Sequence, residues 1–250
     1  TDGLVAFWSF QEAPYVDAVN GYVLKQTVGP PVNRTVGPGA FGPYAVRFVG
    51  GQRLAAPRAS VPAIAAIHGP AAQVSLVAWV ATGDLTSGGY VGGCWQENKA
   101  WRQFALFVHG TAGCQPADGM VAHISGAGSP EDGHKYCESA ACGPQHLPVG
   151  DWDCLANVYN GTHIMAYVNG TLAPGDRNPL QYPSPSFPVG GIFSPPAGGG
   201  ADFAIGANLI HPGGGVGPAA LGNHFVGEMA GFGVFDRALS PQEVHTVCHA

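Results

Sequence analysis

The segment DCLANVYNGTHIMAYVNGTL, residues 153–172, constrains the fold most, because it predicts how its own strands pair. Two runs rich in β-branched and aromatic residues flank Asn160-Gly161, the dipeptide that favours a type I′ turn between antiparallel strands. A second such dipeptide, Asn169-Gly170, ends the return strand. The segment therefore predicts a β-hairpin in an antiparallel sheet.

Further strands are predicted along the whole chain. The runs that indicate them are GLVAFWSF (3–10), YAVRFVGGQRLAAP (44–57), VSLVAWVAT (74–82), RQFALFVHG (102–110), GMVAHISGA (119–127), DFAIGAN (202–208) and HFVGEMAGFGVFD (224–236). One short helix is predicted near the end, where Ser240, Pro241 and Glu243 form a capping box. The content of 39 Gly and 22 Pro, with 10% charged residues, agrees with many short strands joined by turns.

Size and charge limit the classes of partner. At 250 residues, an all-β chain still fits in one domain, and we expect a single domain over 1–250. The net charge is −6 and the 10 Lys and Arg residues form no basic run, so nucleic acid is not an expected partner. No stretch reaches the roughly 20 apolar residues of a membrane span. The chain starts at Thr1 without a signal peptide, and we expect a mature, secreted product.

The cysteines and sequons also point outside the cell. Six cysteines without a CxxC pair favour disulfides in an oxidising compartment. Among the many pairings that six cysteines permit, we predict Cys94 with Cys114, Cys137 with Cys142, and Cys154 with Cys248. Three N-glycosylation sequons begin at Asn33, Asn160 and Asn169.

Three stretches together resemble a known family. GLVAFWSFQEA looks like the opening strand and acidic turn of laminin-G-like and concanavalin A-like domains, residues 152–172 look like their central hairpin, and FAIGAN with FVGEMAGFGVFDRALSPQEV looks like their closing strands and helix. The resemblance implies an all-β, two-sheet antiparallel jelly-roll β-sandwich with a short C-terminal helix. Ala230-Gly231 stand where the family commonly has an acidic pair. The Cys-rich elaboration at about 92–148 is outside the family pattern, so we expect it to carry the individual function.

That stretch carries the residue types that bind sugars. An aromatic ring covers the apolar face of a pyranose, and planar polar groups bond its hydroxyls. Both types occur together in Trp95, Gln96, Glu97, Asn98, Trp101, Arg102 and Gln103. The alternative is that the two tryptophans only pack beneath a cystine at Cys94. The first hypothesis is a carbohydrate-binding domain of lectin type that holds a polysaccharide or glycan on its concave sheet face.

Histidines and a nearby loop extend this predicted site. In the run 119–127, His123 and Ser125 share the strand face opposite Ala122 and Ile124, and His109 ends the neighbouring strand. The loop SPEDGHKYC, residues 129–137, adds His134 and Tyr136 as a lip for a cleft, unless it is merely solvated.

Two other functions use the same residues. A polysaccharide lyase that cleaves uronates by β-elimination would use Arg102 to neutralise the carboxylate, His123 as base and Tyr136 as acid. Glycoside hydrolysis ranks below it, because the paired carboxylates of jelly-roll glucanases do not occur as a local Glu-x-Asp-x-Glu string. The third hypothesis is an extracellular protein-interaction module.

The resemblance also implies a structural Ca²⁺, since lectin-like jelly rolls often fix loops with this ion. Glu12, Asp17 and Asp236 are the candidate ligands, in the first loop and after the last strand. The alternative is that these are surface carboxylates without a metal.

Overall fold

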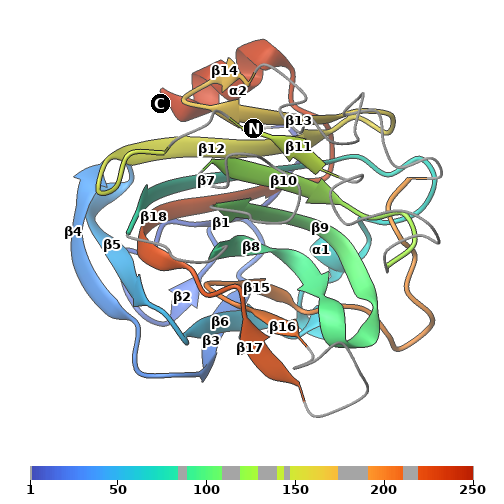
Figure 1. Ribbon diagram of the computed structural model, residues 1–250, viewed down its shortest axis with the longest axis horizontal. Coiled ribbons are helices and arrows are strands. Elements are labelled where there is room, and N and C mark those ends of the chain that lie inside the picture. The colour runs from blue at the N-terminus through green and yellow to red at the C-terminus, as the bar shows by residue number, and fades with distance from the viewer. Residues whose placement is uncertain are drawn as a thin grey trace.

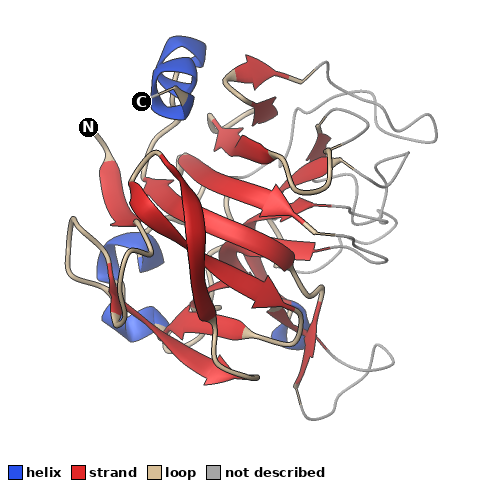
Figure 2. Ribbon diagram, turned by 90° about the vertical axis from the view of Figure 1, so that its left-hand side faces the viewer, coloured by secondary structure: helices blue, strands red, loops and turns tan. Residues whose placement is uncertain are grey.

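The strands of the protein form two stacked, largely antiparallel sheets in the computed structural model (Figure 1). The structure describes residues 2–83, 89–108, 119–128, 140–143, 147–173, 191–210 and 219–249. The helices lie at the periphery of the strand layers (Figure 2). The predicted jelly-roll β-sandwich is therefore confirmed.

The smaller sheet has eight strands within the described residues. Their order is β14 (Thr171–Leu172), β13 (Ile164–Val168), β12 (Trp152–Tyr159), β7 (Val74–Thr82), β18 (Val226–Phe235), β5 (Gly42–Val49) and β4 (Asn33–Gly39), with β1 (Leu4–Trp8) also paired to β18. Helix α2 (Pro241–Cys248) covers part of its outer face, where Val244 is buried beside Trp79 and Tyr167.

The larger sheet has ten strands within the described residues. Their order is β11 (Ala140–Cys142), β10 (Met120–Ile124), β9 (Trp101–Val108), β8 (Gly89–Gln96), β15 (Phe203–Ile205), β6 (Arg53–Ala56), β3 (Val23–Val28) and β2 (Tyr15–Val16), while β16 (Asn208–Ile210) pairs with β8 and β17 (Ala220–Gly222). Three short helices complete this part, η1 (Arg58–Ser60), α1 (Pro62–Ala65) and η2 (Glu97–Lys99).

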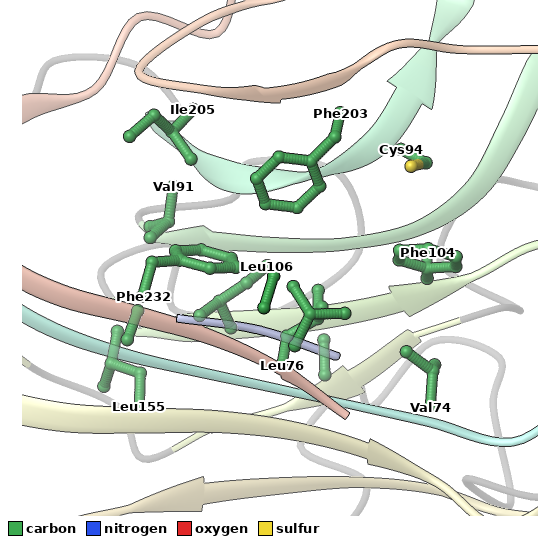
Figure 3. Close-up of a cluster of buried hydrophobic side chains, with 14 of the residues drawn as sticks. Val74, Leu76, Val91, Cys94, Phe104, Leu106, Leu155, Phe203, Ile205 and Phe232 are labelled. Carbon is green, nitrogen blue, oxygen red and sulfur yellow. The ribbon is translucent and has the colours of Figure 1, made fainter. Parts of the chain in front are cut away.

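The main hydrophobic core lies between the two sheets (Figure 3). In β10, Ala122 and Ile124 point into this core and His123 lies on the outer face, as the period-two pattern predicts. A polar contact crosses the core as well, because Asn157 of β12 donates Nδ2 to the carbonyl oxygens of Ala105 (2.9 Å) and His123 (3.2 Å) in the other sheet. Packing and this contact together hold the two sheets against each other.

The predicted hairpin is formed by β12 and β13, with Tyr159 opposite Ile164. The predicted type I′ turn at Asn160-Gly161 is wrong: Gly161 has a φ of 94°, but Asn160 is not left-handed. The backbone N–H of Asn160 donates to the carbonyl of His163, which leaves Gly161 as the first central residue, the glycine position of a type II′ turn.

The second dipeptide has the type I′ pattern instead. Asn169 and Gly170 have φ values of 50° and 74°, and they connect Val168 directly to its partner Thr171.

The C-terminal helix has the predicted start, since Ser240 and Glu243 make both hydrogen bonds of a capping box. The predicted disulfide between Cys154 and Cys248 is confirmed, with a Cα–Cα distance of 5.5 Å. It fastens the end of α2 to β12, so the helix is held at both ends.

The predicted Cys94–Cys114 disulfide is wrong, because Cys94 is a free cysteine. The alternation of β8 turns its side chain into the core near Phe104 and Phe203 (Figure 3), and burial raises the pKa of the thiol to about 12. Cys142 is disulfide-bonded, and its predicted partner Cys137 lies outside the described residues. No helix in the described ranges has the length and apolar character to span a membrane.

Candidate functional site

An open pocket of about 790 Å³ lies at one end of the larger sheet. Its wall is formed by three parts of the chain: the segment 57–66, the facing ends of β8 and β9, and the glycines that precede β15. Its main side chains are Arg58, Gln96, Trp101 and Asp202. We call this the Trp101 pocket.

Trp101 forms the aromatic part of the pocket. It is half-buried, packs on the sandwich core and faces Gln96 across the β8–β9 pairing. Ala100 adopts a left-handed conformation, with a φ of 54°, where the chain turns from η2 into β9. A Cβ on Gly199 would lie only 3.2 Å from the Trp101 indole, so the glycine loop lies directly against this ring.

Arg58 and Asp202 form the charged part of the pocket. Arg58 donates Nη1 to Gln103 Oε1 (2.8 Å) and Nη2 to the carbonyl of Ala65 (2.5 Å), and its backbone N–H donates to Asp202 Oδ1 (3.0 Å). Asp202 Oδ2 lies 3.6 Å from Arg53 Nη2, yet the Asp202 side chain remains 39% exposed. Two N–H groups of the guanidinium are thus bonded within the protein, and the carboxylate can still accept hydrogen bonds from a ligand.

This arrangement suits a flat, hydroxyl-bearing ligand. An indole face gives apolar contact, and a carboxylate and an amide offer directed hydrogen bonds at fixed positions. Because Asp202 and Arg58 are already held by backbone and side-chain contacts, the pocket is formed before a ligand arrives.

A second group of predicted residues gathers on the outer face of the larger sheet. Trp95, Arg102 and His123 are only 5%, 4% and 7% exposed. A bulge in β9 pairs Cys94 with Phe104 but Trp95 with Arg102, which turns Arg102 to the face of Trp95 and leaves Gln103 to bind Arg58. We call Trp95, Arg102, Phe107 and His123 the outer-face cluster.

His123 is enclosed by aromatic rings in this cluster. Its ring centroid lies 5.2 Å from those of Trp95 and Phe107, and its Nδ1 has no hydrogen-bond partner among the described residues. Burial, and then the charge of Arg102, lowers the pKa of His123 to about 4. The imidazole is therefore neutral at pH 7.

The other predicted residues have separate places. Glu97 Oε1 accepts hydrogen bonds from Asn208 (3.2 Å) and Asn223 (3.4 Å), and Ser125 Oγ accepts one from the Gly128 N–H (2.9 Å). The side chain of Asn98, together with His109, His134 and Tyr136, lies outside the described residues. Of the described candidates, the structure brings Gln96 and Trp101 to the pocket and Trp95, Arg102 and His123 to the outer-face cluster.

The three candidate calcium ligands do not form one cluster of carboxylates in the structure. The carboxylate of Asp17 accepts hydrogen bonds from the backbone N–H groups of Val19, Asn20 and Tyr22, while Glu12 and Asp236 are exposed. Within the described ranges, no group of three or more His, Cys, Asp or Glu residues could hold a metal. Calcium binding stays a prediction.

The sequons are on the surface. Asn33, Asn160 and Asn169 are exposed. The amide of Asn169 accepts from the Cys154 N–H and donates to Asp153, both at 2.8 Å. Glycosylation of these residues stays a prediction.

Sequence reasoning missed Arg58 and Asp202. Their hydrogen bond joins positions 144 residues apart, so no local motif announces it. The glycines 198–200 also line the pocket.

The family model described as the concanavalin A-like lectin/glucanases superfamily matches residues 56–245. The chain belongs to this superfamily. Among curated proteins, none matches the sequence of this superfamily member.

Solved structures share its fold at low sequence identity. Domain 4 of AbnA, a GH43 extracellular arabinanase from Geobacillus stearothermophilus, in complex with arabinotriose, is 18% identical with a TM-score of 0.61, covering 98% of both chains. Trypanosoma rangeli sialidase is 16% identical (TM-score 0.58), covering 99% of this chain and 33% of the sialidase. A botulinum neurotoxin type C structure, titled for cell entry that depends on two ganglioside molecules, is 11% identical (TM-score 0.59), covering 99% of this chain and 51% of that one. At identities below 20%, these similarities show that the protein shares its fold with the three structures.

Proposed function

We propose that the protein is a glycan-binding domain of lectin type and that the Trp101 pocket holds the sugar. The observation that carries the proposal is the position of a half-buried indole beside an exposed carboxylate and an amide in one open pocket. The sandwich neighbours that were solved with arabinotriose or studied for ganglioside-dependent entry support a carbohydrate ligand. The disulfide between Cys154 and Cys248 supports secretion into an oxidising compartment.

The proposal places the ligand at the end of the larger sheet and not on its outer face. Trp95, Arg102 and His123 on that face are less than a tenth exposed, so they offer little surface to a polymer. Trp101 and Gln96 are more accessible and border open space of about 790 Å³.

The charges of the pocket favour a neutral glycan. Asp202 brings a carboxylate into the pocket, and the cationic Arg58 guanidinium also lines it, with two N–H groups bonded to Gln103 and Ala65. The opposite charges offset each other, and the carboxylate can accept hydrogen bonds from sugar hydroxyls. The net charge of −6 repels a uronate polymer at low salt.

Affinity electrophoresis against neutral and acidic polysaccharides tests the proposal. We expect at least one neutral polysaccharide to retard the protein, and Trp101→Ala to remove the retardation. Tyr44→Ala is the matched control, because Tyr44 is a 37% exposed aromatic on the smaller sheet. Migration unchanged by every polysaccharide, or retardation that Trp101→Ala leaves intact, would refute the assignment.

The outer-face cluster supports one alternative function, a uronate lyase. A neutral imidazole can accept a proton at pH 7, and His123 lies within electrostatic range of the Arg102 guanidinium that would neutralise a carboxylate. This activity predicts new absorbance at about 235 nm with a uronate polymer and its loss in His123→Ala. No absorbance change with any uronate polymer would exclude the lyase and leave the binding proposal standing.

A further inference from the structure

The last turn of α2 presents two stacked histidines. His245 and the C-cap residue His249 are four positions apart, which places them on one face of the helix. Their ring centroids lie 4.2 Å apart with an interplanar angle of 22°, and both side chains are exposed. A pair of imidazoles with this spacing resembles the His pair with which many helices bind zinc.

The ring of His249 is oriented by the helix itself. Its Nδ1 lies 2.7 Å from the carbonyl oxygen of His245. Because a carbonyl only accepts hydrogen bonds, Nδ1 carries the proton and Nε2 carries the free lone pair. Metal-binding histidines commonly donate their second nitrogen to a carbonyl in this way, which fixes both tautomer and ring direction.

The backbone that carries the two rings is held in place by its surroundings. Cys248, between them in sequence, is bonded to Cys154 of β12. Strand β14 lies beside α2 (Figure 1), and the turn between β13 and β14 contacts the end of the helix at Gly170. A Cβ on Gly170 would come within 3.0 Å of the His249 ring. Because a metal ion lies in the plane of each imidazole that binds it, the two nearly parallel rings must turn about their side-chain bonds before both can bind one ion.

We propose that His245 and His249 chelate a divalent transition metal of the zinc, nickel or copper type at the end of α2. Imidazole nitrogen is a preferred ligand for these ions, and the C-terminal end of a helix favours positive charge. Water completes the coordination, since the described residues place no third His, Cys, Asp or Glu in such a group. Ca²⁺ and Mg²⁺ do not bind there, because they require oxygen ligands.

Isothermal titration of the untagged protein with Zn²⁺ tests this proposal, with Ca²⁺ as the second titrant. We expect one saturable Zn²⁺ site, a loss of about tenfold or more in affinity for His245→Gln and for His249→Gln, and no heat from Ca²⁺ at these positions. His163→Gln is the control, because His163 is an exposed histidine in the β12–β13 turn. Saturable binding that survives both helix variants, or none at all, would overturn the proposal.

A spectroscopic readout counts the ligands directly. Electron paramagnetic resonance of bound Cu²⁺ is expected to show two imidazole nitrogens in the wild type and one in either helix variant. Two nitrogens in both variants would also overturn the proposal. The Trp101 pocket takes no part, so glycan retention by His249→Gln is expected to equal that of the wild type.

Discussion

The burial of His123 predicts a specific loss of stability in mild acid. In the unfolded chain a histidine has its ordinary pKa of about 6.5, while in the folded protein the pKa is about 4. Above pH 6.5 the ring is neutral in both states, so its burial makes the free energy of unfolding no more dependent on pH. Between pH 6.5 and 4 only the unfolded state takes up the proton, so stability falls as the pH falls.

The size of this effect follows from the difference in pKa. Each pH unit inside the window costs about 1.4 kcal/mol. On going from about pH 7.5 to about pH 5, His123 alone therefore removes about 2 kcal/mol of the free energy of unfolding. Solvent weakens this effect little, because His123 is only 7% exposed.

Urea denaturation of the wild type and His123→Phe at these two pH values measures the effect. Phenylalanine keeps a ring between Trp95 and Phe107 but cannot be protonated, so the variant should lose about 2 kcal/mol less than the wild type. His123→Gln provides a second non-titrating variant, and the exposed His163→Gln should behave as the wild type. Equal losses in the wild type and both His123 variants would show that His123 does not resist protonation.

Three further changes test other parts of the structure. Replacing Cys154 and Cys248 by alanine opens a cross-link between positions 94 residues apart and should cost about 4 to 5 kcal/mol in guanidinium denaturation; an unchanged midpoint would contradict this. Ser240→Ala removes the N-cap of α2 and should cost about 1 kcal/mol, visible as a lower Tm. Gly231→Ala puts a Cβ within 2.8 Å of the Phe41 ring and should cost about 1 to 3 kcal/mol; a more stable variant would refute that contact.

The fold was predictable where the signal is local. Alternation in the run 119–127 correctly placed His123 on the face of β10 opposite Ala122 and Ile124, and the capping box at Ser240 marked the start of α2. The hairpin at 153–172 was predictable, but its turn was not. Asn160 Oδ1 accepts the N–H groups of Thr162 and His163, so this asparagine caps the strand and the turn begins one residue later.

The predicted Cys94–Cys114 disulfide was wrong because the local sequence does not show which way Cys94 points. The Gly-rich run 89–96 gave no clear strand pattern, so nothing in the sequence indicated that Cys94 faces the core. No feature of the sequence predicted the bulge at Gln103, although the bulge decides which side of the sheet Arg102 occupies.

The candidate site was predictable only in part. The run from Trp95 to Gln103 was singled out because both residue types occur together there, and it contributes Gln96 and Trp101 to the pocket. Its partners Arg58 and Asp202 come from distant segments that meet only in the folded sandwich. Local composition cannot reveal such a meeting.

A crystal structure of the protein with a neutral oligosaccharide that it retains would test the central claim most directly. The proposal predicts a sugar ring against the indole of Trp101, with a hydroxyl donating to the carboxylate of Asp202. A sugar bound instead at the outer-face cluster, over Trp95 and His123, would contradict it.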